Sequence, residues 1–173
     1  MTIWTETLPF SLIQPRTALL LLAFIAADIL LVVFALQYVA DLAPCRMCIW
    51  QRWPFAILIA VGLTGAFWKP RLVLVLTIPL LLVSAGLAGY HVGVEQGWIA
   101  LPAGCTAGGA ATSVEELKAL LAAAPPSCDQ VGFTMLGLSL AGWNLVVSLL
   151  LAGFSLFVMT RPQGNQRQGA GIA

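Results

Sequence analysis

The sequence predicts an all-α membrane protein, an up-down-up-down bundle of four transmembrane helices that forms a single domain over residues 1–173. Hydrophobic residues make up 60% of the chain and charged residues only 9%, whereas about a quarter of the residues of a soluble domain are charged. So few charges cannot cover a water-exposed surface. Four apolar stretches are each long enough to cross a bilayer, which takes roughly 20 helical residues. The net charge of +1 gives no indication of a nucleic-acid partner.

The predicted spans are residues 17–40, 49–68, 72–93 and 138–159. The first is longer than the apolar core of a secretory signal, which has roughly 7–15 residues, and three further spans follow it. Residues 41–48 and 69–71 are short connections, so the helices that they join must be antiparallel neighbours. The connection between the third and fourth spans, residues 95–133, is long and polar.

This long loop carries one helical pattern. Ser113 and Glu116 have the spacing of a capping box, and Pro125 and Pro126 end the pattern. Between them apolar residues recur at helical intervals: Val114, Leu117, Leu120, Leu121 and Ala124. We expect a short amphipathic helix in the membrane interface, the alternative being a disordered loop.

The Lys and Arg residues predict the orientation. With four spans, both termini and the 69–71 turn share one side of the membrane. That side carries Arg16, Lys69, Arg71, Arg161 and Arg167, and the other carries Arg46, Arg52 and Lys118. Cytoplasmic segments carry the excess of positive charge, so both termini are expected in the cytoplasm. All four cysteines then lie on the outer side, where disulfides persist.

Cys45 and Cys48 form a C-x-x-C motif at the start of the second span. Alone, this motif serves redox exchange, metal binding or neither. At a helix N-terminus the unpaired N–H groups and the helix dipole stabilise a thiolate and lower its pKa, which favours redox chemistry. A soft copper site is the rival interpretation, and its ligands would be Cys45, Met47, Cys48 and His91.

Three polar side chains lie within or beside the apolar spans. Arg52 follows the motif by four positions, which predicts the same helical face about one turn deeper. It either faces an anionic group, such as a thiolate or a reduced quinone oxygen, or extends to the lipid headgroups. His91, the only histidine, either hydrogen-bonds a quinone carbonyl or sits at the interface. For Asp28, in mid-span, we expect a protonated carboxyl bonded to a residue such as Ser84 or Ser148, with no role assigned.

Cys105 and Cys128 lie in the long loop and allow two interpretations. A disulfide between them would be a structural staple that restricts the unfolded loop. Alternatively, they form a second redox pair, which exchanges with the first by thiolate attack through mixed disulfides. Two pairs on one face of a small bundle suit such a relay.

The residues around the motif resemble a known family. The pattern Pro44-Cys45-x-x-Cys48-x-x-Gln51-Arg52, at the end of a short outer turn, is similar to the signature of disulfide bond formation protein B, the DsbB family. The resemblance extends to the later cysteine pair, to the four-span layout and to the start of the fourth span, Gly137-Leu138-Ser139-Leu140-Ala141-Gly142-Trp143-Asn144. It covers nearly the whole chain and leaves only the two tails unmatched.

The resemblance implies an enzyme of the bacterial inner membrane. It would re-oxidise DsbA, a periplasmic thioredoxin-fold protein, and pass the electrons to a membrane quinone, either ubiquinone or menaquinone. In the implied relay a DsbA thiolate attacks Cys105 of a Cys105–Cys128 disulfide. Cys128 then attacks Cys45 and releases Cys48, which reduces the quinone. The implied quinone-binding residues are Cys48, Gln51, Arg52 and His91, and no metal is implied.

Three other classes stay open. A vitamin K epoxide reductase-like enzyme also joins cysteine pairs to a quinone in a small bundle, but there the C-x-x-C motif follows the loop cysteines, whereas here it precedes them. A copper-handling membrane protein is the next alternative. A non-enzymatic protein with structural disulfides leaves Arg52 unexplained.

Overall fold

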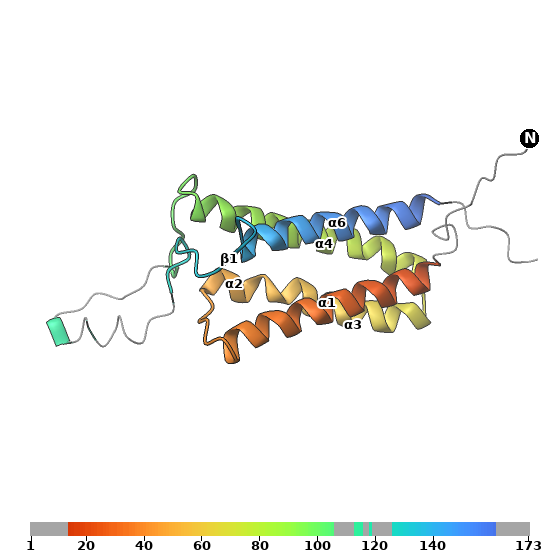
Figure 1. Cartoon of the computed structure of the whole chain (residues 1–173). Helices are drawn as coiled ribbons and strands as arrows, with labels where there is room; N and C mark the ends of the chain where they lie inside the picture. Colours follow the sequence, from red (N-terminus) through yellow and green to blue (C-terminus); the bar gives the residue numbers. More distant parts are fainter. Residues whose placement is uncertain (1–13, 106–112, 116–117, 119–125, 162–173) are drawn as a thin grey trace, which may run out of the picture.

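Four antiparallel spans form the bundle (Figure 1) in a computed structural model that describes residues 14–105, 113–115, 118 and 126–161. The elements in chain order are α1 (Pro15–Tyr38), α2 (Arg46–Trp50), α3 (Arg52–Phe67), α4 (Pro70–Glu95), β1 (Thr134–Met135), β2 (Leu138–Ser139) and α6 (Leu140–Thr160). Helices α2 and α3 together make one span, so four described segments are long and apolar enough to cross a membrane. The predicted all-α, up-down-up-down bundle is confirmed, and each span boundary agrees with its prediction to within three residues.

Prolines account for several helix ends. Pro15 and Pro70 occupy the first turn of α1 and α4, where the missing N–H would have no helical partner. Pro54 has no N–H to donate to the carbonyl four residues earlier, that of Trp50. The second span is accordingly interrupted at Gln51, where α2 ends and α3 begins. This interruption separates the C-x-x-C motif from the rest of the span.

A two-residue hairpin precedes α6 and was not predicted from the sequence. Strands β1 and β2 pair in antiparallel register, and the two turn residues, Leu136 and Gly137, both have positive φ. This backbone is that of a type I′ turn, for which glycine is well suited. The fourth helix therefore begins at Leu140, two residues later than predicted, and the side chain of Ser139 caps it by accepting from the N–H of Gly142.

The predicted interfacial helix falls mostly outside the described residues. Of that segment the structure describes residues 113–115 and 118, and Val114, Glu115 and Lys118 are helical. The capping partner Glu116 and the apolar residues from 119 to 124 are not among them.

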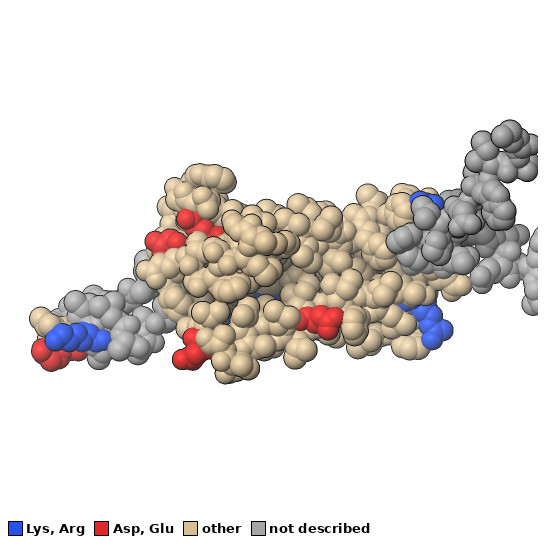
Figure 2. All heavy atoms as spheres, viewed as in Figure 1, with Lys and Arg blue, Asp and Glu red and all other residues tan. Residues whose placement is uncertain are grey.

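The outside of the bundle is apolar along its length and charged at its ends. At most 33% of the most apolar window of each span is buried, so most of these hydrophobic side chains face outward, as lipid contact requires. Figure 2 shows Lys and Arg at one end of the bundle, most of the acidic side chains toward the other, and a further basic group on the long loop that extends beyond the acidic end. The basic end is formed by the first turns of α1 and α4 and the end of α6, and the cysteines lie at the opposite end.

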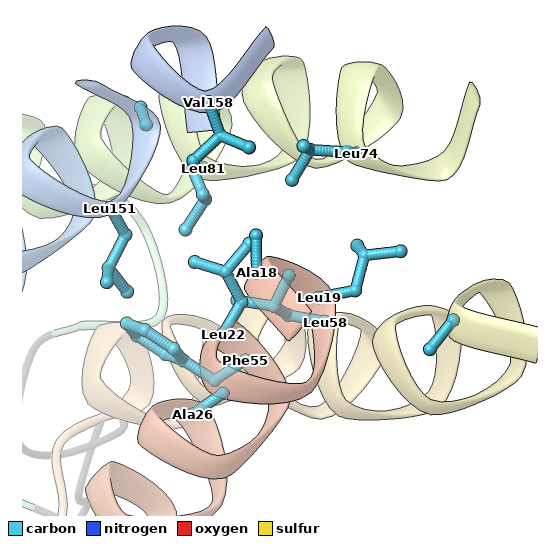
Figure 3. Close-up of a cluster of buried hydrophobic side chains, with 12 residues drawn as sticks. Ala18, Leu19, Leu22, Ala26, Phe55, Leu58, Leu74, Leu81, Leu151 and Val158 are labelled. Atoms are coloured by element: carbon cyan, nitrogen blue, oxygen red, sulfur yellow. The ribbon is translucent and has the colours of Figure 1, made fainter. Parts of the chain in front are cut away.

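The helices pack as two pairs, α1 with α3 and α4 with α6, and the contact between α1 and α6 is slight. Fully buried leucines join the pairs (Figure 3), among them Leu19, Leu58 and Leu81. Close approach of α1 to α3 requires Gly62, because a Cβ there would lie 3.1 Å from the carbonyl oxygen of Leu19. The weak contact between α1 and α6 leaves space at the cysteine end of the bundle.

Candidate active site

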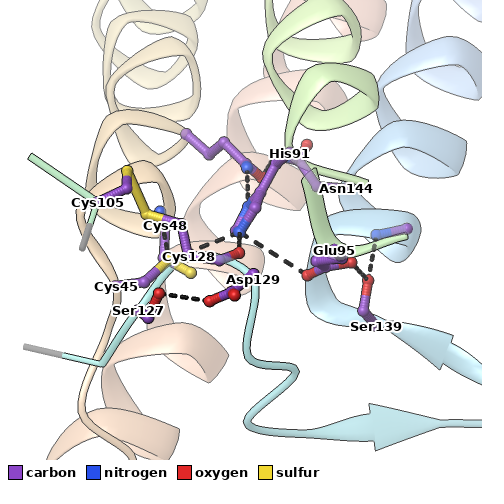
Figure 4. Close-up of polar contacts among 12 residues, drawn as sticks. Cys45, Cys48, His91, Glu95, Cys105, Ser127, Cys128, Asp129, Ser139 and Asn144 are labelled. Carbon is purple, nitrogen blue, oxygen red and sulfur yellow. Dashed lines mark hydrogen bonds and ion pairs between the residues drawn. A yellow bond between two sulfur atoms is a disulfide. The ribbon is translucent and has the colours of Figure 1, made fainter. Parts of the chain in front are cut away.

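The four cysteines lie together at one end of the bundle, as Figure 4 shows. Cys105 and Cys128 form a disulfide, whereas Cys45 and Cys48 are free thiols. All but Cys48 are buried, and Cys48 packs against the same cluster. The two pairs that the sequence places far apart are therefore neighbours, as disulfide exchange requires.

Cys45 is the N-cap of α2, and its surroundings stabilise the thiolate form of its side chain. Its Sγ accepts a hydrogen bond of 3.2 Å from the backbone N–H of Cys48 and lies 3.7 Å from Nε2 of His91. A hydrogen bond from the Cys48 side chain, followed by that from His91, lowers the pKa of the Cys45 thiol from 9.0 to about 4, although burial alone would raise it. These contacts favour the thiolate form of Cys45, and a thiol of low pKa is a good leaving group in disulfide exchange.

His91, from α4, connects the two cysteine pairs. The ring is 2% exposed, and its Nε2 lies 3.2 Å from the backbone oxygen of Cys128 as well as facing Cys45. Its Nδ1 lies 2.7 Å from Nε2 of Gln51. Both ring nitrogens thus have protein partners, so His91 forms part of the support of the thiolate.

A buried polar chain continues from His91 into the bundle. Oε1 of Gln51, at the break between α2 and α3, accepts a 2.7 Å hydrogen bond from Nδ2 of Asn144 on α6. Oδ1 of Asn144 in turn accepts from the hydroxyls of Ser148, at 2.9 Å, and Ser84, at 3.3 Å. Residues from the second, third and fourth spans thereby hold one another in place.

This arrangement corrects the expectation for Asp28. Ser84 and Ser148 hydrogen-bond to each other and to Asn144, so the suggested pairing of either serine with Asp28 is wrong. Asp28 is exposed on α1 and lines a cavity. Every side of α1 is apolar, so the sequence did not indicate which face turns inward.

Arg52 begins α3 and reaches across to α1. Its Nη1 donates a 2.6 Å hydrogen bond to Oε1 of Gln37, and the guanidinium lies 5.0 Å from the ring centre of Phe34. Its Nε is buried and has no hydrogen-bond partner among the described residues. Among the described residues no hydrogen bond joins Arg52 to Cys48, although both line the same cavity.

A cavity of about 810 Å³ lies between α1 and the start of α6. Cys48 and Arg52 both line it, together with Gln51, His91 and Asn144. The remaining wall is largely apolar and includes Ile29, Val33, Leu36, Phe55, Leu140 and Val147. The cavity thus joins a thiol, a cation and an apolar surface.

The sequence did not single out several residues of this site. Gln37 orients Arg52, and Glu95 accepts a 2.6 Å hydrogen bond from Ser139, which ties the end of α4 to the start of α6. Asn144 was noticed only as part of a motif. The available signal was polarity itself, because an amide or carboxylate within an apolar span needs a partner in the bundle.

The chain matches the family described as "Disulfide bond formation protein DsbB" over residues 15–158. The chain belongs to the DsbB family. Several relatives carry the name Disulfide bond formation protein B. One from Azoarcus sp. (strain BH72) is 34% identical over 133 residues, which cover 70% of this chain and 80% of the relative. One from Hahella chejuensis is 30% identical over 155 residues, covering 84% and 94%. No solved structure gives a significant match.

Membership of the DsbB family makes the chain a multi-pass membrane protein of disulfide bond formation. A relative from Burkholderia pseudomallei (strain 1106a), 27% identical, aligns over 94% of this chain and 99% of its own length. The vitamin K epoxide reductase-like alternative is therefore set aside in favour of the DsbB family.

Proposed function

We propose that the protein re-oxidises a DsbA-like periplasmic thioredoxin-fold protein and passes the electrons to a membrane quinone. Its family membership supports the disulfide chemistry. The observation that carries the quinone is the cavity itself, because the guanidinium-bearing Arg52 and the thiol-bearing Cys48 line it together with an apolar wall. A guanidinium at the edge of an apolar cavity suits a ligand oxygen, with which it can form a charge-assisted hydrogen bond.

The cavity lining fits a quinone. Its apolar wall suits a hydrophobic ring and tail, and most small-molecule sites combine such a wall with a few polar groups that fix orientation. Arg52 would hold a ring oxygen, and Cys48, which lines the same cavity as Cys45, would be the thiol that reacts with the quinone. Gln51 and His91 would support the site through their bonds to each other and to Cys45. When bound, the quinone supplies a two-electron, two-proton acceptor.

The cysteine geometry supports an exchange relay from the loop pair to the motif. A partner thiolate attacks Cys105, breaks its bond to Cys128 and leaves Cys128 as a thiolate. Cys128 attacks Cys45 of an oxidised Cys45–Cys48 pair and releases Cys48. The partner's second thiolate resolves the mixed disulfide, and the freed Cys105 attacks Cys128, which restores the loop disulfide and releases Cys45.

The end state of these steps has the same cysteine pairing as the structure: the loop disulfide is closed and Cys45 and Cys48 are reduced. The last exchange expels Cys45, whose thiolate is stabilised by the Cys48 N–H and by His91. A thiol of low pKa leaves faster. In the whole cycle one partner dithiol becomes a disulfide and one quinone becomes a quinol.

We further propose that the chain lies in the bacterial inner membrane with both termini in the cytoplasm. Arg16, Lys69, Arg71 and Arg161 stand at the end of the bundle opposite the cysteines. Positive charge favours the cytoplasmic side, and the loop disulfide favours the periplasmic side.

Stoichiometry with purified components tests the proposed function. Protein in lipid nanodiscs is mixed with a reduced DsbA-like partner and a water-soluble ubiquinone, and both partner thiols and quinone absorbance are followed. We expect one quinone to be consumed for each partner disulfide formed, with Cys105→Ser as the inactive control. Sustained partner oxidation without any quinone would overturn the proposed acceptor.

A soft-metal site is the second candidate function. Ligand atoms of Cys45, Cys48 and His91 lie within 4.8 Å of one another. Two thiols and an imidazole suit zinc or cuprous ion. Nε2 of His91 already bonds the Cys128 oxygen, which a metal would have to displace. Metal analysis of protein purified without chelator, against a Cys45→Ser control, tests this candidate.

A further inference from the structure

Three acceptors surround Nε2 of His91. The backbone oxygen of Cys128 lies 3.2 Å away, the sulfur of Cys45 3.7 Å away and Oε1 of Glu95 3.8 Å away. A peptide oxygen and a thiolate can only accept hydrogen bonds, and an ionised carboxylate likewise. A lone pair on Nε2 would therefore face three others, so Nε2 must carry a proton.

The row of buried hydrogen bonds through Gln51 and Asn144 sets the protonation state of the other ring nitrogen, Nδ1. With the proton on Nε2, a neutral His91 has its lone pair on Nδ1, and Gln51 must turn its NH₂ group toward it, at 2.7 Å. The oxygen of Gln51 then faces the NH₂ group of Asn144, at 2.7 Å. The oxygen of Asn144 receives the hydroxyls of Ser148 and Ser84. In this direction every donor, from the two serine hydroxyls to the NH₂ group of Gln51, meets an acceptor.

The opposite direction would require a second ring proton. If Gln51 presented its oxygen to His91, Nδ1 would need a proton. A neutral ring would then place the lone pair of Nε2 against the Cys128 oxygen, and a ring protonated at both nitrogens would be a cation. In the observed direction a proton on Nδ1 would meet the NH₂ group of Gln51 instead of an acceptor. The chain therefore disfavours the imidazolium.

We propose that Asn144 is a positioning residue that, through Gln51, holds His91 as the neutral tautomer protonated at Nε2, so that one N–H serves both the Cys128 carbonyl and the Cys45 sulfur. This N–H docks the loop disulfide on the bundle and stabilises the Cys45 thiolate. Asn144 does both from a different span, without touching either cysteine. The inference does not depend on which molecule accepts the electrons.

The single histidine of the chain makes the tautomer directly measurable. Nitrogen NMR of protein labelled at histidine, with the loop disulfide closed and the motif reduced, distinguishes protonated from unprotonated ring nitrogens. In the wild type we expect a protonated Nε2 and an unprotonated Nδ1. A proton on Nδ1 would overturn the proposal.

Asn144→Asp should reverse the direction of the hydrogen bonds from residue 144 through Gln51 to His91. A carboxylate cannot donate to Gln51, so Gln51 turns its NH₂ group to Asp and its oxygen to Nδ1 of His91. Since the three acceptors keep Nε2 protonated, both ring nitrogens should then show protonated shifts. The matched control is Ser155→Ala on the same helix α6, which removes the 3.3 Å hydrogen bond from Thr77 on α4 and should leave the histidine spectrum unchanged.

Gln51→Glu provides the same test through another side chain if the Asn144→Asp protein does not fold. Its carboxylate accepts from Asn144 and from a protonated Nδ1, so it too should yield the doubly protonated ring. An unchanged wild-type spectrum in a folded Asn144→Asp or Gln51→Glu protein would overturn the proposal.

The rate of disulfide exchange tests whether the His91 tautomer affects the release of Cys45. Asn144→Leu leaves Gln51 free to turn either way, so the Nε2 proton is present only part of the time. Closure of the loop disulfide with release of Cys45 should slow about tenfold, the effect of losing roughly one hydrogen bond. The first attack on Cys105 should keep its wild-type rate. Equal slowing in Ser155→Ala would show a general packing effect and overturn the assignment.

Discussion

Nη1 of Arg52 donates a 2.6 Å hydrogen bond to the side-chain oxygen of Gln37, and this bond joins the start of α3 to α1 across the wall of the cavity. The ring of Phe34 lies against the same guanidinium. The arginine is thereby oriented by α1, while its Nε stays free of any partner in the described chain. Quinone binding should depend on this one side chain more than on its neighbours.

Arg52→Ala should weaken quinone binding and slow quinone reduction about ten- to hundredfold. The lost interaction is a charge-assisted hydrogen bond, worth roughly 1.5–3 kcal/mol, and 1.4 kcal/mol corresponds to about a factor of ten. Arg52→Lys should be intermediate, because it keeps the charge and loses the planar fork. The measurement is quinone reduction against quinone concentration. Loss of single-turnover thiol exchange with intact quinone kinetics would instead assign Arg52 to folding or partner docking.

Cys45 should remain a thiolate far into the acidic range. Its pKa is lowered to about 4 from 9.0, so the folded protein favours the thiolate and this contribution to stability, complete above about pH 9, is lost as pH falls toward 4. Ultraviolet thiolate absorbance, taken as the difference from Cys45→Ser, should titrate near pH 4. Cys48→Ala removes the largest cause and should raise that midpoint. A wild-type midpoint near 9 would contradict the geometry.

Cys128→Ser should leave Cys105 able to trap the soluble partner as a stable mixed disulfide. The serine cannot take part in the exchange that normally follows attack on Cys105. Non-reducing electrophoresis should show the adduct, and Cys105→Ser should abolish it. If both variants turned over at the wild-type rate, the Cys105–Cys128 disulfide would be only a structural staple.

Reporter fusions check the orientation. Fusions after Arg161 and at Lys69 should report the cytoplasm, because the basic end of the bundle favours that side. A fusion at Gly97, in the turn after α4, should report the periplasm. A periplasmic reporter after Arg161 would be incompatible with four spans and a cytoplasmic N-terminus.

Gly62→Ala should destabilise the bundle by about 1–3 kcal/mol, the usual cost of overpacking a core. The added methyl would lie 3.1 Å from both the Leu19 oxygen and the Ala23 Cβ on α1. Gly86→Ala on α4 is the matched control, since nothing lies within 4 Å of its added Cβ. Thermal unfolding in detergent should give a lower Tm for Gly62→Ala alone. Equal Tm values would mean that α1 moves aside at little cost.

Hydropathy alone predicted the four spans and their alternating directions, because a bilayer demands long apolar helices and short turns force them antiparallel. The cysteine motif could also be placed at a helix start. The hairpin before α6 was missed because each of its strands has only two residues. Its turn glycine, Gly137, was the one local signal.

The polar chain lay beyond sequence analysis for a different reason. Gln51 and Asn144 are 93 positions apart, and their contact depends on how two spans are rotated about their axes. In helices that are apolar on every side, rotation is decided by packing against neighbours. The same uncertainty led to the wrong partner for Asp28.

One atom links the chemistry of this protein to its local folding. The sulfur of Cys45 caps α2, a helix of five residues that is too short to be stable by itself. A thiolate accepts hydrogen bonds more strongly than a neutral disulfide sulfur. We therefore expect oxidation of Cys45 to loosen the first turn of α2 and reduction to tighten it. Fraying of α2 should then alternate with each catalytic cycle. Hydrogen exchange at the Cys48 amide should be faster when Cys45 is oxidised than when it is reduced.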